Sequence, residues 1–210
     1  MEQESPSSTV KPPETVRQLQ MPAALALADL TAIFEDLTKV VGCCEQTLSV
    51  LEQARPGANE ILVESLWTTA LVSYRRCFSA GKHGAGLSEQ DLDETGLQGD
   101  VAEWHKTLEK LREHYVDTGV DPRESFVVGA AQDVDGNANG IAITSAPQPQ
   151  LDETTVRQTG QLALELSRVV DQRIKTQQES VYNAARAMSP DDLSALALVH
   201  VADPEGAERD

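Results

Sequence analysis

The sequence predicts a mainly α-helical fold, an up-down bundle of about four long helices with a β-hairpin inserted before the last long helix. Apolar residues recur every three or four positions over long stretches, which is the pattern of helices with one buried face. A loop rich in Gly, Asn and Asp between two β-prone runs interrupts this pattern. The chain has 210 residues, so it can bury a core without stabilising disulfides or metals.

The first helix is expected to begin at Pro22, because proline suits a first helical turn. Pro56 and Gly57 stop it. Its buried stripe consists of small or apolar residues that follow helical spacing: Leu25, Ala28, Ala32, Phe34, Leu37, Val40, Val41, Cys44, Leu48 and Leu51. Charged residues are expected on its other faces: Asp29, Glu35, Asp36 and Lys39.

The next helices follow from the same periodicity and from their capping residues. Residues 59–78 have a broad apolar face that suits a central bundle helix and includes Trp67. Ser88 is expected to cap a short helix, with Asp91 three residues further on. Residues 100–115 form another helix, which Gly119 ends.

A β-hairpin is expected at about residues 125–145, because two β-prone runs flank a loop of turn-forming residues. The loop also matches the first half of a calcium-binding loop: Asp135, Asn137, Asn139 and Gly140. The bidentate acid that completes such a site is absent, because Ala146 stands at its position. Asn and Gly are also the residues that a tight turn requires. We therefore favour a turn and expect no metal.

The longest helix is expected after the hairpin, from Asp152 to about Met188. Asp152 suits the N-cap position. The apolar stripe of this helix consists of residues at helical spacing: Leu162, Leu166, Val169, Val170, Ile174, Val181 and Ala185.

The chain divides into three regions. Residues 1–20 contain several Ser and Pro residues and almost no large apolar side chain, so we expect a flexible tail. Residues 21–188 form the helical bundle domain with its hairpin. Residues 189–210 contain a short helix that starts at Ser189 and an acidic tail.

The charge balance disfavours two classes of partner. The chain has 34 acidic and 17 basic residues, a formal net charge of -17. Nucleic-acid affinity depends on cations placed on phosphates, and anionic membranes attract basic segments, so nucleic acid is disfavoured and no membrane is expected. No signal peptide or membrane-spanning run is visible, and no nucleotide-binding or hydrolase motif. We expect a cytoplasmic protein without a cofactor, and the sequence allows a protein partner.

Cys43, Cys44 and Cys77 are an odd number of cysteines without CxxC spacing. Adjacent cysteines are poorly placed for a structural disulfide. A zinc site or a catalytic thiol would need His or Cys partners, and the sequence places none nearby. We therefore expect reduced thiols in the core.

Arginine–histidine pairs are the candidate catalytic groups. Metal-independent phosphodiester cleavage needs a base for the ribose 2′-OH and a cation for the phosphorane oxygens. Arg76 and His83 lie seven positions apart, but Gly81 between them indicates a helix end, so they need not share a face. His105 and His114 are nine positions apart on one helix, and each is expected to be a surface or partly buried side chain.

Two segments carry a family resemblance. The first is Leu66–Phe78, and the second is Arg112-Glu-His-Tyr-Val-Asp-Thr118. Together they resemble HEPN-like (higher eukaryotes and prokaryotes nucleotide-binding) helical bundles of an uncharacterised bacterial group, in which a helix carries R-x-K-H-I-A-H with x acidic or an amide. Arg112 falls on the motif arginine, Glu113 on its polar neighbour and Thr118 on the final histidine. The resemblance spans roughly residues 25–185, and the hairpin and long last helix suit the group.

The resemblance implies a homodimer in which arginine and histidine from two protomers meet at a cleft. A threonine hydroxyl cannot act as a general base near neutral pH, so Thr118 predicts a catalytically inactive protein-interaction or weak nucleotide- or RNA-binding module. The alternative is a metal-independent ribonuclease of the toxin or phage-defence kind, with His114 or His83 in place of the missing base. Because His114 is two positions from Arg112, the two side chains point to different faces of a regular helix, and only a pairing between protomers would join them.

Overall fold

The computed structural model describes residues 13–53, 59–116, 124–147 and 151–201. The chain is mainly helical, as the sequence predicts. Its elements, in chain order, are β1 Thr15–Arg17, α1 Pro22–Gln53, α2 Glu60–Cys77, α3 Glu89–Asp93, α4 Val101–Val116, β2 Glu124–Gln132, β3 Ala138–Pro147, α5 Glu153–Ala187, α6 Pro190–Ala195 and β4 Leu198–His200. In these ranges, each helix is too short or too polar to cross a bilayer.

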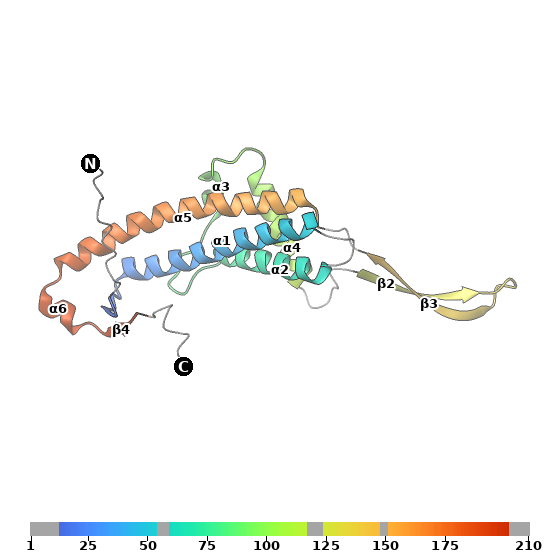
Figure 1. The fold of residues 1–210 in the computed structure, drawn as a ribbon, viewed down its shortest axis with the longest axis horizontal. Helices are drawn as coiled ribbons and strands as arrows, with labels where there is room; N and C mark the ends of the chain where they lie inside the picture. The colour runs from blue at the N-terminus through green and yellow to red at the C-terminus, as the bar shows by residue number, and fades with distance from the viewer. Residues whose placement is uncertain (1–12, 54–58, 117–123, 148–150, 202–210) are drawn as a thin grey trace, which may run out of the picture.

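The long helix α1 lies between α5 and α2 and runs antiparallel to both (Figure 1). At one end of the α1–α5 pair, Arg157 Nη2 lies 3.4 Å from the Glu52 carboxylate; at the other, Gln177 Nε2 donates to the carbonyl of Ala23 over 3.0 Å. The fourth long helix, α4, packs on α2. The two longest helices, α1 and α5, therefore lie side by side and run in opposite directions.

The hydrophobic core lies between these four helices. It also includes Leu92 of the short helix α3 and Leu87, just before that helix. Trp67 and Tyr74 of α2 are its largest fully buried side chains, so the core position predicted for Trp67 is confirmed. The helices α1 and α5 approach closely at Gly160, where an added Cβ would lie 3.1 Å from the Cβ of Cys44. A larger side chain there would force the two longest helices apart.

The position predicted for Asp29 on the first helix is wrong. It was expected on an outer face, but only 5% of it is exposed. Its Oδ2 accepts hydrogen bonds from the backbone N–H groups of His83 (2.9 Å) and Ala85 (3.0 Å), in the loop that follows α2. These loop amides have no helical partner, so a buried carboxylate satisfies them. Ala28 and Ala32, expected in the buried stripe, are exposed.

The predicted helix caps are confirmed. Ser88 and Asp91 form a reciprocal capping box at the start of α3. The Asp152 carboxylate accepts from the N–H of Thr155 at the start of α5, and the Ser189 hydroxyl accepts from the N–H of Asp192 at the start of α6. Each cap satisfies a backbone donor that the first helical turn leaves without a partner.

The strands β2 and β3 form a two-stranded antiparallel hairpin that extends away from the helices (Figure 1). Its turn closes through the Asp133 carboxylate, which accepts from the N–H groups of Asp135 and Asn137 at 3.0 and 2.9 Å. Gly136 has a φ of +85°, which favours glycine. The loop is therefore a turn, as the sequence favours.

A second small sheet joins the two ends of the described chain. Strand β1 pairs antiparallel with β4, with Val16 opposite Val199. Residues 15–17 were predicted to belong to a flexible tail, and this part of the prediction is wrong because the backbone of β4 completes their hydrogen bonds. Residues 1–12 and 202–210, which include most of the two predicted tails, lie outside the described residues.

Candidate functional site

The motif residues of the family resemblance lie at the C-terminal end of α4. Arg112 is half-buried and Glu113 is exposed. The His114 ring meets the ring of Tyr115 edge-on, with 5.6 Å between the centroids. Thr118, at the position of the motif histidine, lies outside the described residues.

His83 does not meet Arg112 within one protomer. The helices α2 and α4 run antiparallel: Tyr74 contacts His105, while burial and the nearby Glu64 carboxylate both raise the pKa of Tyr115. Arg112 therefore lies beside the middle of α2, at about the level of Trp67, and His83 follows the C-terminal end of this helix. The ten or so helical residues between these positions span about 15 Å.

His105 is buried, with 4% of it exposed, and is not the surface or partly buried residue that the sequence suggested. Its Nδ1 lies 2.9 Å from the Tyr74 hydroxyl, and its ring packs 4.3 Å from the centroid of the Phe78 ring. On its other side, Nε2 lies 3.8 Å from the Glu109 carboxylate. A sequence signal for this burial exists, because His105 stands three positions before Leu108 on the apolar face of α4.

This Tyr74–His105 pair is suited to a structural role. Burial lowers the pKa of His105 from its ordinary value of 6.5, and the Glu109 carboxylate only partly offsets this effect. Burial also raises the pKa of Tyr74 well above its usual range. Both side chains are therefore neutral near pH 7, and one hydrogen bond satisfies a polar group on each within the core.

The lowered pKa of His105 predicts a pH-dependent stability. The unfolded chain takes up this proton near pH 6.5 and the folded chain only at lower pH, so stability falls as the pH drops below 6.5. For one proton the slope is at most about 1.4 kcal/mol per pH unit. Urea unfolding at pH 7.5 and 5.5 measures this change in the free energy of unfolding. A Tyr74→Phe/His105→Leu double variant should lose the part of the pH dependence that comes from His105. His83→Ala is the control and should keep the full pH dependence. If the double variant also keeps it, the pH dependence does not come from His105.

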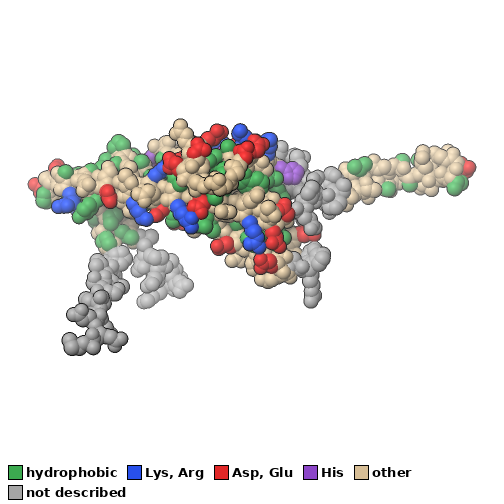
Figure 2. Space-filling model, turned by 90° about the horizontal axis from the view of Figure 1, so that it is seen from above, with side chains coloured by type: hydrophobic (Ala, Val, Ile, Leu, Met, Phe, Trp, Pro, Cys, Tyr) green, Lys and Arg blue, Asp and Glu red, His purple; other side chains and the backbone are tan. Residues whose placement is uncertain are grey.

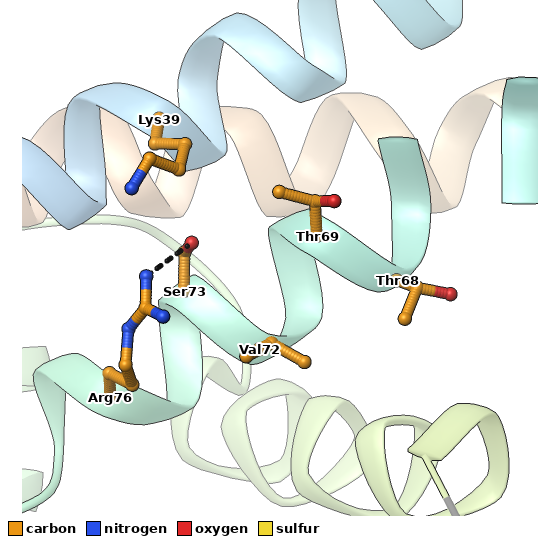
Figure 3. A pocket seen from close by; sticks show the side chains of 6 residues that line it. All are labelled: Lys39, Thr68, Thr69, Val72, Ser73 and Arg76. Carbon is orange, nitrogen blue, oxygen red and sulfur yellow. Dashed lines mark hydrogen bonds between the residues drawn. The ribbon is translucent and has the colours of Figure 1, made fainter. Parts of the chain in front are cut away.

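A shallow groove between α1 and α2 contains Arg76 but not His83, and Figure 3 shows its side chains. The cavity measures about 290 Å³. Two cations and several hydroxyls line it: Lys39, Thr68, Thr69, Val72, Ser73 and Arg76. The Arg76 guanidinium donates to the Ser73 hydroxyl over 3.1 Å. This lining has the chemistry of a weak anion site.

The Asp36 carboxylate already forms ion pairs with both cations of this groove. Arg76 Nε donates to its Oδ2 over 2.9 Å, and Lys39 Nζ lies 3.4 Å from its Oδ1. Partial burial would raise the pKa of Asp36, but the two cations hold that pKa below its ordinary value of 3.8. Arg76 therefore pairs with Asp36 and not with His83, and a bound anion would have to compete with a carboxylate.

The three cysteines are free and buried, so the predicted core thiols are confirmed. Burial raises the pKa of Cys44 and of Cys77 to about 12, which leaves almost no thiolate at neutral pH. In the part of the chain that the structure describes, no three His, Cys, Asp or Glu side chains gather as a metal site would require.

The structure is that of a mainly helical protein with a projecting β-hairpin. Its described histidines lie in separate places: His105 is buried, His114 is partly buried on α4, and His83 and His200 are exposed. Comparisons of the chain with protein-family models, with curated proteins and with solved structures find no match.

Proposed function

We propose that this chain is a homodimeric, catalytically inactive protein of the HEPN-like kind that acts through protein contacts. The observation that carries the proposal is the exposure of the hairpin. From Phe126 to Ser145, every residue except Asp133 is exposed, including six large apolar side chains: Phe126, Val127, Val128, Val134, Ile141 and Ile143. Contiguous exposed apolar residues of this kind mark interaction surfaces.

The arrangement of the helices supports the scaffold part of the proposal. The helices α1, α2, α4 and α5 pack as antiparallel neighbours, which is what an up-down bundle requires. The hairpin precedes the long last helix, in the order that the family resemblance implies. We therefore propose an up-down four-helix bundle from which the hairpin extends.

Three features of the chain support catalytic inactivity. Arg112 lies beside the middle of α2 and His83 lies beyond its C-terminal end, about 15 Å away along the helix. His105 is buried and bonded to the Tyr74 hydroxyl. Thr118 stands where the motif has its histidine, and a hydroxyl does not titrate near neutral pH. The net charge of -17 adds a general electrostatic barrier to RNA.

The proposal predicts no metal-independent cleavage of RNA. Purified full-length chain, incubated with a labelled RNA in the presence of a chelator, should give the same products as buffer alone. Arg112→Ala should behave identically. Cleavage that depends on Arg112 would establish the alternative, a metal-independent ribonuclease, and His114→Ala and His83→Ala would then identify its base.

A further inference from the structure

We infer that one face of the β2–β3 hairpin is the dimer interface, and that it packs against the same face of a second copy with the two hairpins antiparallel. The apolar centre of this face consists of side chains that point to one side of the sheet: Phe126, Val128, Ala130, Ile141 and Ile143. Ser145, opposite Phe126, lies on the same side. The inference rests on the proposed function, because it names the partner and the surface of the proposed dimer.

The strand register separates the hairpin into two unlike faces. Residues directly opposite each other in an antiparallel pair share a face, and successive residues alternate between faces. Val128 pairs with Ile143 and Ala130 with Ile141, which puts the large aliphatic side chains on one face. The opposite face holds Val127 with Thr144 and two pairs of small residues: Gly129 with Ala142, and Ala131 with Gly140.

The apolar face needs a cover that the described helices do not supply. An isolated two-stranded hairpin is marginally stable in water, and it becomes stable when a further layer buries its hydrophobic face. The helices end before the hairpin begins, and the hairpin extends alone (Figure 1). Ile143 is 71% exposed and Phe126 59% exposed, so neither is covered within the described protomer.

The charge distribution favours this face as the place where a second copy packs. The segment from Glu124 to Pro147 contains three acidic residues and no lysine or arginine, so fourteen of the seventeen excess negative charges lie elsewhere in the chain. Figure 2 shows charged side chains gathered on the helical body and an acidic tip on the hairpin. The five side chains Phe126, Val128, Ala130, Ile141 and Ile143 are uncharged. A second copy that packs here brings two acidic chains together through the segment that carries few of their charges, where they repel least.

The same charges favour the antiparallel arrangement. Asp133 and Asp135 lie at the hairpin tip, and the acidic helical body lies at its base. A parallel arrangement would bring tip to tip and body to body, and like charges would face each other at both ends. The antiparallel arrangement places the bodies at opposite ends, where each faces only the two tip carboxylates of the other copy, so the total repulsion is smaller. A two-fold axis across the middle of the face then brings Val128 next to Val128 of the second copy.

The inference is tested by sedimentation equilibrium of the full-length chain across the micromolar range, with two matched variants. Val128→Glu places a carboxylate on the apolar face, and Val127→Glu places it on the opposite face. The two valines are neighbours on β2, 65% and 62% exposed, and outside the helical core. We expect Val128→Glu to raise the dimer dissociation constant about 100-fold or more, because the symmetric interface is altered twice. Val127→Glu should change it less than about threefold.

Each other outcome overturns the inference. A wild-type chain that stays monomeric contradicts both this interface and the proposed dimer. A dimer that survives Val128→Glu retains the proposed function but places its interface elsewhere. Equal dissociation by both variants indicates pairing along the strand edges, or general loss of the hairpin, instead of packing through one face. Far-ultraviolet circular dichroism checks that the helices of both variants remain intact.

Discussion

Replacing Trp67 with alanine is expected to lower the free energy of unfolding by about 3–5 kcal/mol. Trp67 lies in the middle of α2 and is 1% exposed. Its removal takes away the largest buried side chain of the core and leaves a cavity that the surrounding helices fill only in part. Urea unfolding followed by circular dichroism measures the loss.

Ile61→Ala is the matched control for this prediction. Ile61 lies on the same helix, six residues earlier, and is 72% exposed. Its replacement should change the stability by no more than about 0.5 kcal/mol. Similar losses in the two variants would show that α2 does not bury the face described above.

Replacing Arg173 with leucine is expected to cost about 2–3 kcal/mol. Arg173 of α5 pairs with the buried Asp91 carboxylate, which caps α3, and its Nη2 also lies 3.0 Å from Glu94. The substitution leaves Asp91 buried with only the Ser88 donors. The loss is smaller than for a fully buried pair, because about a third of the Arg173 side chain is exposed and water screens the charge.

The stabilisation by the Arg173–Asp91 pair is also expected to depend on pH. Burial alone would raise the pKa of Asp91, but Arg173 and Ser88 hold it below its ordinary value of 3.8. The stabilisation is therefore present above pH 3.8 and is lost as the pH falls through the lowered pKa. Arg168→Leu, which removes an exposed pair with Glu165 on the same helix, should cost at most about 1 kcal/mol. Equal costs for Arg173→Leu and Arg168→Leu near neutral pH would contradict the role of Asp91.

Much of the helical framework follows from local sequence. Pro22, Ser88, Asp152 and Ser189 mark helix starts through short-range hydrogen bonds or fixed backbone angles, so their effect is readable without knowing the fold. The hairpin follows from its turn residues for the same reason. These signals depend on residues within about one helical turn or one β-turn.

The features that sequence analysis missed depend on contacts between distant segments. Asp29 is buried because a loop more than 50 residues later places two amides beside it. His105 is buried because Tyr74 offers it a hydrogen bond across a helix interface. Strand β1 exists because β4, near the other end of the chain, pairs with it. Local periodicity contains no information about such partners.

Only part of the candidate site could be predicted from the sequence. The sequence contains the Arg112 motif, but the separation of Arg112 from His83 depends on how α2 and α4 pack, which spacing alone does not give. The hairpin was predicted from its β-prone runs, yet runs such as Phe126–Val128 usually indicate buried strands. Their exposure is visible only when the structure shows that no helix covers them.

Cross-linking at Val128 tests the central claim most directly. The three native cysteines are buried, so a cysteine placed on the hairpin is the main accessible thiol among the described residues. A short bismaleimide should join two copies of a Val128→Cys variant, because the proposed axis brings these positions together. The neighbouring Val127→Cys variant, on the opposite face, should stay largely uncross-linked. Failure of Val128→Cys to cross-link, or equal cross-linking of both variants, would contradict a dimer formed through this face.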